Sequence, residues 1–554
     1  MKKMYSLLFL TFLVTLLNAQ QIHADLVLLN GKIFTARDPH HFVEAMAIKD
    51  GQIMAIGQNS RLQAMVGANT RRINLRGKLV LPGFHDAHLH FWSGALLNHQ
   101  LNLTGMRNKE EVLKKIKSTV DKLQPGEWLI GRGWDHELWK DKQLPTHLEL
   151  DYISTQNPIF LKRVDGHAAW VNKKVLQIIG YDRFTPDPPG GKILRFVENG
   201  EPSGILIETA YEPIEQILPI PPREARLKIL REAMAYANSL GITSITDNSE
   251  TFIFEDYVKL LTERPPLMRV HFWVYFQLHL DTLRNWAASF RTDSRLLCMP
   301  LVKFFADGSM GSRSAFVLQP YADDPGNSGL PQHQPEELYQ MVNQAYQQGW
   351  IIGVHAIGDA ANRMVLDIFE QLRPTGWPDK PRLRIEHAQF VQPNDVIRFA
   401  QLGVIASMQP SHCISDMKWV KERVGEAARY TYSWRSMLQQ GVILAFGTDW
   451  PVEPLNPFLG IYAAVTRQDT SGYPPQGWYS EQRLSVAEAI LAYTTGSAYA
   501  VEREDWLGRL LPGYAADFIV VDRDIFSIPP AEIRKTRIEM TVVNGEMVYS
   551  SESF

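Results

Sequence analysis

The chain has 554 residues, 45% of them apolar, and a formal net charge of −3 at pH 7. This length is ample for a large core with accessory domains, and the small net charge gives no electrostatic argument for binding nucleic acid or an anionic membrane surface. We therefore expect an ordinary globular protein without a nucleic-acid partner.

The first residues have the pattern of a cleaved secretory signal. A basic start, Met1-Lys-Lys, is followed by an apolar run from Leu7 to Leu17 and then by Ala19. The run is shorter than the roughly 20 apolar residues of a membrane span. We predict a signal peptide over residues 1–19 and a periplasmic or secreted mature protein with no stable membrane insertion. An uncleaved anchor is the alternative.

Short strands with tight turns are expected at both ends of the chain. Asn30-Gly31 and Asp50-Gly51 lie between apolar runs near the N-terminus, and Asn544-Gly545 does so near the C-terminus. Such dipeptides are typical of hairpin turns. We predict one small β-sandwich that combines residues 20–80 with residues 504–554.

Between these ends, strand-like apolar runs alternate with helical patterns, which is typical of βα units and a parallel sheet. Eight runs predict an α/β fold, a (β/α)8 TIM barrel over residues 81–503, with its active site at the carboxyl ends of the strands. The eight runs are residues 79–81, 241–247, 267–275, 301–307, 350–355, 383–387, 404–408 and 442–449.

One connection, residues 92–222, is too long for a single βα unit. We predict that it forms an inserted α/β subdomain after the first strand, covering the mouth of the barrel. The only cysteines, Cys298 and Cys413, would then lie at opposite ends of the barrel, about 20 Å apart. A disulfide requires Cα atoms within about 7 Å, so we expect two free thiols.

Histidines and an aspartate close several of these strands. His88 and His90 lie two residues apart, so an extended strand places both imidazoles on one face. His355, His387 and Asp449 each end a later strand. Alone, each is equally an ordinary hydrogen-bonded histidine or a helix N-cap. Together at the catalytic face of one barrel, they predict a divalent metal site.

Lys303, on the fourth strand, is a further candidate. As an ammonium it would repel a metal ion, and it is then an ordinary surface or salt-bridged lysine. If CO2 carbamylates the amine, the product is a carboxylate that can bridge two ions.

These motifs resemble the amidohydrolase superfamily, and within it amidohydrolase family 3, the YtcJ-like metal-dependent hydrolases. The resemblance covers nearly the whole mature chain. Its marks are Pro82-Gly-Phe-His-Asp-Ala-His-Leu-His90, Asp165-Gly-His167, Thr185-Pro-Asp-Pro-Pro-Gly-Gly191, Lys303-Phe-Phe-Ala-Asp-Gly-Ser-Met-Gly-Ser-Arg313, His355-Ala-Ile-Gly-Asp359, Ile385-Glu-His-Ala388 and Gly447-Thr-Asp-Trp-Pro451.

The resemblance implies how the metal ligands divide. His88 and His90 would hold the more buried ion with Asp449, and His355 and His387 would hold the outer one. A carbamylated Lys303 would bridge them. Zinc is the expected ion, and because the superfamily includes single-metal members, one or two ions are expected.

The expected reaction is hydrolysis of a carbon–nitrogen bond in a non-peptide amide or cyclic amide, by water that the metal activates. Asp449 would be the catalytic residue that accepts the proton of this water and delivers it to the leaving nitrogen. Two alternatives stay open: hydrolysis of an ester, lactone or phosphoester at the same site, and a non-catalytic exported binding protein.

Substrate contacts are expected from Asp165 and His167 in the insertion and from Arg313 after the fourth strand. A hydrogen-bond network that holds the insertion to the barrel is the alternative role for each. The expected partner is a small-molecule substrate, and a homodimer is left open.

Overall fold

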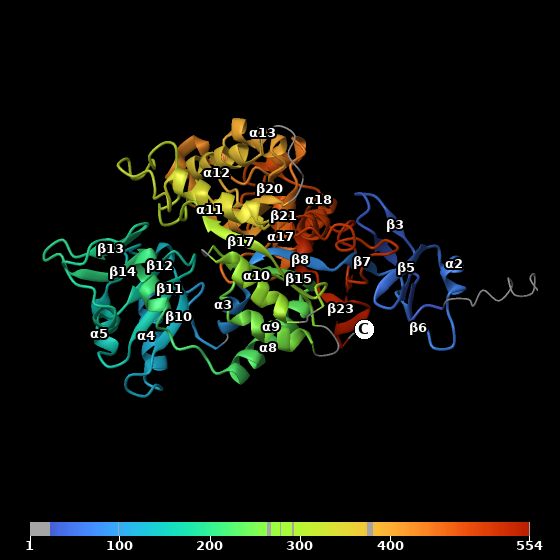
Figure 1. Cartoon of the computed structure of the whole chain (residues 1–554), viewed down its shortest axis with the longest axis horizontal. Coiled ribbons are helices and arrows are strands. Elements are labelled where there is room, and N and C mark those ends of the chain that lie inside the picture. The colour runs from blue at the N-terminus through green and yellow to red at the C-terminus, as the bar shows by residue number, and fades with distance from the viewer. Residues whose placement is uncertain are drawn as a thin grey trace, which may run out of the picture.

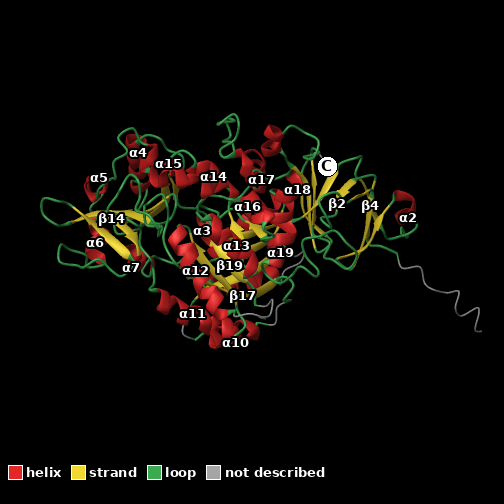
Figure 2. Ribbon diagram, turned by 90° about the horizontal axis from the view of Figure 1, so that it is seen from above, coloured by secondary structure: helices red, strands yellow, loops and turns green. Residues whose placement is uncertain are grey.

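The computed structural model describes residues 23–97, 99–262, 267–276, 279–290, 293–373 and 381–552. The predicted signal peptide, residues 1–19, lies outside this part of the chain. Three lobes follow one another in a row, with a barrel in the middle, an insertion on one side and a β-sandwich on the other (Figures 1 and 2).

The central lobe is a (β/α)8 barrel, as predicted. Its eight strands are all parallel and neighbour one another in chain order. They are β8 (Phe84–Leu89), β15 (Ile242–Asp247), β16 (Arg269–Tyr275), β17 (Leu297–Phe305), β18 (Ile351–Ala356), β19 (Leu383–His387), β20 (Ile405–Met408) and β21 (Leu444–Phe446). The helices between and after them are α3 (Phe91–Leu96), α8 (Arg223–Ser239), α9 (Ile253–Leu261), α10 (Leu280–Ser289), α11 (Pro335–Gln347), α12 (Asp359–Leu372), α13 (Pro393–Gln401), α14 (Pro410–Asp416), α15 (Val420–Val424), α16 (Trp434–Gln439), α17 (Pro457–Thr466), α18 (Val486–Leu491) and α19 (Ser497–Tyr499).

Helix α8 illustrates why the helices cover the barrel. Leu227, Leu230 and Met234 recur at helical spacing and are buried against the strands. Gly241 follows the helix with a φ of 82°, a conformation that a residue with a Cβ adopts only with strain. The chain therefore turns there and enters β15.

The first barrel strand differs from the prediction. Residues 79–81 belong to β7 (Leu79–Pro82), which pairs with strands of the sandwich, and the barrel begins with β8. The change of sheet occurs at Gly83, whose N–H donates to the carbonyl of Asp517, while Phe84 N–H donates to Gly241 in the barrel, both at 3.0 Å. An apolar run alone does not reveal which sheet it joins.

The sandwich combines strands from both ends of the chain. One sheet has the order β5-β4-β1-β6 and the other β24-β23-β22-β7-β2-β3. One hydrophobic cluster between them includes Leu28 and Val80 from the first end and Phe518 and Val542 from the second. The strands are β1 (Leu26–Leu29), β2 (Lys32–Phe34), β3 (Phe42–Val43), β4 (Ala45–Lys49), β5 (Gln52–Gly57), β6 (Arg71–Asn74), β22 (Phe518–Val521), β23 (Ile538–Val543) and β24 (Glu546–Ser550), with helix α2 (Asn59–Gln63).

The insertion contains a six-stranded mixed sheet in the order β13-β14-β12-β11-β10-β9, with a hydrophobic cluster on each face. Strand β17 of the barrel ends toward this lobe, so the insertion lies beside the carboxyl ends of the barrel strands (Figure 1). Its elements are β9 (Leu101–Asn102), α4 (Lys109–Val120), β10 (Leu129–Trp134), α5 (His147–Ile153), β11 (Ile159–Arg163), β12 (Ala168–Val171), α6 (Lys173–Ile178), β13 (Gly191–Arg195), β14 (Pro202–Glu208) and α7 (Glu212–Glu215).

The barrel closes between its first and last strands at a seam formed by β8 and the segment after β21. Asp449 N–H donates to the carbonyl of His88 at 2.7 Å, and His90 N–H donates to the carbonyl of Trp450 at 2.8 Å. The Asp86 carboxylate accepts from the hydroxyl of Thr448 at 2.6 Å. The seam therefore brings together two segments that both carry predicted metal ligands.

Cys298 and Cys413 are both free, as predicted. Within the described residues, none of the helices has the length and apolar character that crossing a membrane requires.

Candidate metal centre

The predicted ligands converge at the carboxyl ends of the barrel strands. His88 lies on β8 and His90 directly after it, His355 lies on β18, and His387 ends β19. Asp449 follows β21 across the seam. All but His90 are buried, and His90 is partly exposed. Strands that are far apart in the sequence therefore deliver these side chains to one place.

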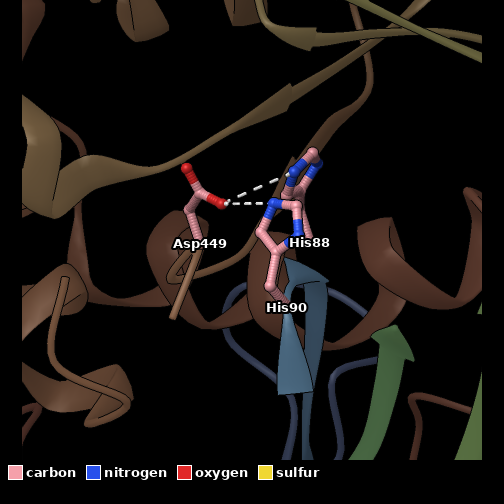
Figure 3. A group of neighbouring side chains, drawn as sticks. All are labelled: His88, His90 and Asp449. Atoms are coloured by element: carbon pink, nitrogen blue, oxygen red, sulfur yellow. Dashed lines mark ion pairs between the residues drawn. The ribbon is translucent and has the colours of Figure 1, made fainter. Parts of the chain in front are cut away.

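His88, His90 and Asp449 form one group of possible ligands (Figure 3). Oδ1 of Asp449 lies 3.4 Å from Nε2 of His90 and 3.6 Å from Nε2 of His88. Two ligand atoms on a tetrahedral ion with bonds of about 2.1 Å are about 3.4 Å apart. Oδ1 of Asp449 is also buried without a hydrogen-bond partner in the described structure. The spacing and the unpaired oxygen both fit a metal ion.

His88 and His90 both have Nε2 near Asp449 and use Nδ1 to contact a carbonyl or carboxylate oxygen. His88 uses Nδ1 to contact Oε2 of Glu386 at 2.7 Å, and His90 uses Nδ1 to contact the carbonyl of Asn248 at 3.0 Å. Because these oxygens can only accept, each Nδ1 carries the proton and each Nε2 is left as a ligand atom.

The other two predicted histidines are held in the same manner. Nδ1 of His387 contacts Oε1 of Gln409 at 2.8 Å, which leaves Nε2 free. His355 contacts the carbonyl of Gly308 through Nε2 at 3.1 Å, which leaves Nδ1 free. The His355 and His387 rings are 4.5 Å apart. Each of the four imidazoles therefore has one unprotonated ring nitrogen.

Burial lowers the pKa of all four histidines well below the ordinary value of 6.5. They are therefore neutral near pH 7, as metal ligands must be. Burial raises the pKa of Asp449 to about 7, although the nearby positive charges of Lys303, Arg132 and His167 act in the opposite direction.

His412, which the sequence analysis missed, also reaches this centre. It forms a second group with His387 and Asp449, and its Nε2 lies 3.6 Å from Oδ2 of Asp449 without a hydrogen-bond partner in the described structure. Burial lowers the pKa of His412 to about 4. His355, in contrast, belongs to neither group of three. The position of His412 soon after the seventh strand, in Gln409-Pro-Ser-His412, was the signal that could have revealed it.

Lys303 lies on β17 beside the first group. Its Nζ is 3.5 Å from Nε2 of His88 and stands over the rings of Trp273 and Phe305. Burial lowers the pKa of Lys303 to about 8. Among the described residues, no carboxylate oxygen lies within 4.0 Å of this amine.

Of the three predicted substrate contacts, His167 lies beside a predicted ligand, whereas Asp165 pairs with Arg163. The His167 ring is 5.7 Å from that of His355, and Oδ1 of Asp165 accepts from the His167 N–H at 3.1 Å. Burial opposes protonation of His167, but the carboxylate of Glu208, 3.0 Å from its Nδ1, outweighs burial and raises its pKa to about 9. Arg313 is instead held by Asp323, at 2.8 Å, and contacts none of the predicted ligands.

The backbone is strained at three of these positions. His387, Asp449 and Glu208 have φ values of 72°, 57° and 51°. Residues with a Cβ seldom adopt this region, and such residues concentrate where a side chain must be aimed at a site. The strain is consistent with a functional centre between β8, β19 and the insertion.

A family model and several known proteins match most of this chain. A family model described as "Amidohydrolase family" matches residues 71–549. "Putative amidohydrolase YtcJ" of Bacillus subtilis is 32% identical, with 94% of this chain and 98% of that protein covered. "Protein LONG AFTER FAR-RED 3" of Arabidopsis thaliana is 34% identical, with 95% and 92% covered.

The name of a less similar relative states a chemical activity. "N-substituted formamide deformylase" of Arthrobacter pascens is 25% identical, with 95% of this chain and 98% of that protein covered. Among solved structures, an uncharacterized metal-dependent hydrolase from Pyrococcus horikoshii superimposes with a TM-score of 0.73 at 29% identity. That superposition covers 91% of this chain and 99% of the other.

Proposed function

This chain belongs to the amidohydrolase family, and from that premise we propose that it is a metal-dependent hydrolase that cleaves a non-peptide carbon–nitrogen bond of a small molecule. The observation that carries the proposal is the group of His88, His90 and Asp449, whose possible ligand atoms are spaced for one ion. The names of two relatives, an amidohydrolase and a deformylase of N-substituted formamides, favour an amide or cyclic amide over an ester.

Two sets of side chains would hold metal. His88, His90 and Asp449 would hold one ion, and His387 would hold a second with His355 on one side and His412 on the other. Imidazole and carboxylate ligands suit zinc, which is the ion we expect. Once bound, a divalent ion there supplies Lewis-acid polarisation and lowers the pKa of water toward 7.

Asp449 would carry the proton in this reaction. A carboxyl group with a pKa of about 7 exchanges its proton readily near neutral pH. It can take a proton from the attacking water and later give it to the leaving nitrogen. An amide nitrogen leaves far more easily when it is protonated, so a carboxyl group at this position suits a carbon–nitrogen bond.

His167 would assist from the insertion. Its Nδ1 is held by Glu208, and its raised pKa keeps the ring positively charged at neutral pH. The remaining N–H is then a donor that can stabilise negative charge on the substrate carbonyl oxygen.

Lys303 would join the two sets of ligands as a carbamate, which forms when its neutral amine adds CO2 and releases a proton. The lowered pKa of Lys303 increases the share of neutral amine, and the amine lacks a carboxylate partner among the described residues. A chelated protein that recovers its metal only with bicarbonate present would support the carbamate, and full recovery without bicarbonate would contradict it.

Asp449→Asn tests the proposal directly. The carboxamide keeps the shape and can still coordinate weakly, but it cannot accept a proton. We expect a folded protein that retains part of its metal and loses roughly 100-fold or more in kcat, the usual size of a general acid–base contribution. Metal content and turnover of a panel of amides should be measured on the same preparation.

Asp505→Asn is the matched control, because Asp505 is exposed. The control should behave as the wild type. Loss of less than a few-fold in kcat with the metal retained in Asp449→Asn would assign the proton transfer elsewhere. Full activity of demonstrably metal-free protein, or turnover of esters with no amide hydrolysed, would refute the proposed function.

A further inference from the structure

The insertion has a hydrophobic core of its own, which the barrel does not share. Among the described residues, the two hydrophobic clusters of the insertion contain only side chains from residues 101–218, and none of these belongs to a cluster of the barrel. The sandwich differs, because Phe34 and Ile519 are part of the large cluster of the barrel. The sandwich and the barrel therefore form one packed body, and the insertion is a second one beside it (Figure 1).

Polar contacts join the insertion to the mouth of the barrel. Three side-chain hydrogen bonds cross between them, each donated by a barrel residue to a carboxylate of the insertion. They are Ser314 Oγ to Glu208 Oε1 at 2.7 Å, Ser309 Oγ to Asp165 Oδ2 at 3.4 Å, and Arg423 Nη2 to Glu137 Oε1 at 3.3 Å. Each such bond contributes little net stability, because both groups bind water when they separate. A boundary of this kind, without a shared hydrophobic core, lets the two bodies move relative to each other.

The two connections between the barrel and the insertion start from neighbouring helices. The chain leaves the barrel after Leu96, at the end of α3, and returns before Arg223, at the start of α8. Helices α3 and α8 pack against each other, so both connections are on the same side of the barrel mouth. Two connections placed in this way can serve as a hinge, since a few residues between elements absorb the change in backbone angles.

In the described arrangement, the insertion is closed over the metal centre. The centroid of the His167 ring is 5.7 Å from that of His355, and the side chains of His355 and His387 are 3% and 5% exposed. A planar amide group between the rings of His167 and His355 needs about 7 Å, which is two carbon contact distances of about 3.5 Å. Entry of a substrate carbonyl between these rings therefore requires the insertion to move away from the barrel.

Glu208 connects this movement to the placement of His167. Its Oε2 lies 3.0 Å from Nδ1 of His167 within the insertion, and its Oε1 accepts from the hydroxyl of Ser314 in the barrel. Gly308 leaves the space for this second contact, because a Cβ there would collide with the Ser314 hydroxyl and with the Glu208 carboxylate. The carboxylate that orients His167 is therefore held by the barrel only while the insertion is closed.

We propose that the insertion opens and closes over the metal centre, and that Glu208 is the positioning residue that fixes His167 for catalysis in the closed state, through its bond to Ser314. The part played by His167 rests on the proposed function, in which its ring faces the substrate carbonyl. The movement of the insertion does not depend on the reaction.

Spin labels measure the movement on the metal-loaded, full-length protein without any substrate. One label is attached at Glu198→Cys, between β13 and β14 of the insertion, and the other at Gln371→Cys on α12 of the barrel, both at exposed positions. The background is Cys298→Ser, since the other native cysteine, Cys413, is buried. We expect the distance between the labels to have a major short population, the closed state, and a minor long one, the open state.

Gly308→Ala should raise the ratio of the long to the short population about 10-fold, the usual effect of a lost hydrogen bond to a charged group, because the added methyl group keeps Glu208 from Ser314. Ser314→Ala and Glu208→Gln should act in the same direction, and they test the contact if Gly308→Ala fails to fold. Gly326→Ala is the matched control, a glycine between β17 and α11 at which a Cβ would meet nothing within 4 Å, and it should keep the wild-type distances.

Kinetics test the placement of His167. Ser314→Ala should lower kcat for amides about 10-fold and change KM less than about 2-fold, because the lost bond acts in the closed state, in which the reaction occurs. Glu208→Gln should lower kcat at least as much, since it also loosens the ring of His167. Ser118→Ala, at an exposed serine of the insertion, is the control and should leave both constants unchanged.

Two results would overturn the inference. The first is a label distance that is the same in the wild type, Ser314→Ala and Glu208→Gln, which would show that the insertion is fixed on the barrel. The second is a rise in KM with unchanged kcat in Ser314→Ala, which would show that the contact does not place a group for catalysis. Failure of the proposed function is distinguishable. If no amide is hydrolysed, the label distances in Glu208→Gln still decide whether Glu208 holds the insertion closed.

Discussion

Glu386 lies behind His88 and fixes the direction of its imidazole. Oε2 of its carboxylate lies 2.7 Å from Nδ1 of His88. Oε1 accepts a hydrogen bond from Nε of Arg384 at 2.9 Å. Arg384 in turn donates to the carbonyl of Ala87 on β8 and to the hydroxyl of Ser407 on β20. A fully buried ion pair therefore ties three strands together directly beneath a predicted ligand.

Glu386→Gln should weaken metal binding without removing a ligand. A neutral amide holds the proton on His88 Nδ1 less firmly and makes the ring a weaker ligand, so the affinity for zinc should fall about 10- to 100-fold. Competition with a chelator of known affinity measures this. Glu504→Gln, which alters another arginine-paired glutamate away from the centre, is the control. Unchanged affinity in Glu386→Gln would show that Glu386 only packs the barrel.

The sequence pattern indicated the candidate metal ligands, but it did not indicate the residues that hydrogen-bond to those ligands. His88 and His90 were predicted from their spacing of two residues, and His355, His387 and Asp449 because each ends an apolar run at one face of the barrel. Glu386 was missed because it looks like an ordinary strand residue, and its partner lies 298 positions away. Nothing in the sequence near Glu386 indicates its contact with His88. The sequence also did not indicate that Arg313 pairs with the Asp323 carboxylate.

Strand β14 and the turn before β12 show how the insertion supplies charge to the barrel. β14 ends at Glu208, whose strained φ of 51° aims its carboxylate at Nδ1 of His167 and at the hydroxyl of Ser314 in the barrel. One carboxylate therefore holds a residue of the insertion and a residue after β17. Sequence pattern predicted an inserted α/β subdomain over residues 92–222, but not the order of its strands or this contact.

The His167–Glu208 pair should make the stability of the protein depend on pH. The pKa of His167 is about 9 in the folded chain and near 6.5 when unfolded, so the stabilisation is complete below pH 6.5 and disappears as pH rises through 9. The loss should be roughly 1–3 kcal/mol. Thermal unfolding between pH 6 and 10, compared in wild type and His167→Gln, measures it.

In His167→Gln the decline in unfolding temperature over this interval should be smaller than in the wild type. His40→Gln, at an exposed histidine outside the insertion, is the control and should follow the wild type. Equal decline in wild type and His167→Gln would contradict the assignment of the raised pKa to this pair.

The sandwich and the barrel are joined through a buried ion pair as well as through the chain. Arg269, at the start of β16, contacts Asp517 before β22 at 2.6 Å, with both side chains almost fully buried. The (β/α)8 architecture was predictable, since eight apolar runs matched the eight barrel strands to within a few residues except at residues 79–81. That run joined the sandwich because its pairing partners are β2 and β22, both outside the stretch predicted as barrel.

At the scale of the whole molecule, we predict that the protein is exported from the cytosol. Protein recovered from a bacterial periplasm or medium should begin near Gln20, because the apolar run before Ala19 has the form of a cleaved signal. N-terminal sequencing of the recovered protein is the measurement. Intact residues 1–19 in cytosolic protein would contradict export.

The seam between β8 and the segment after β21 has a consequence for the order in which a ribosome makes the chain. β8 emerges early, but one of its edges has no partner until residues 448–450 follow, and one edge of β7 waits for β22 at residues 518–521. Unpaired strand edges are templates for association with other chains. We therefore expect a nascent chain halted before residue 448 to aggregate more readily than the finished chain, and to depend more on a chaperone.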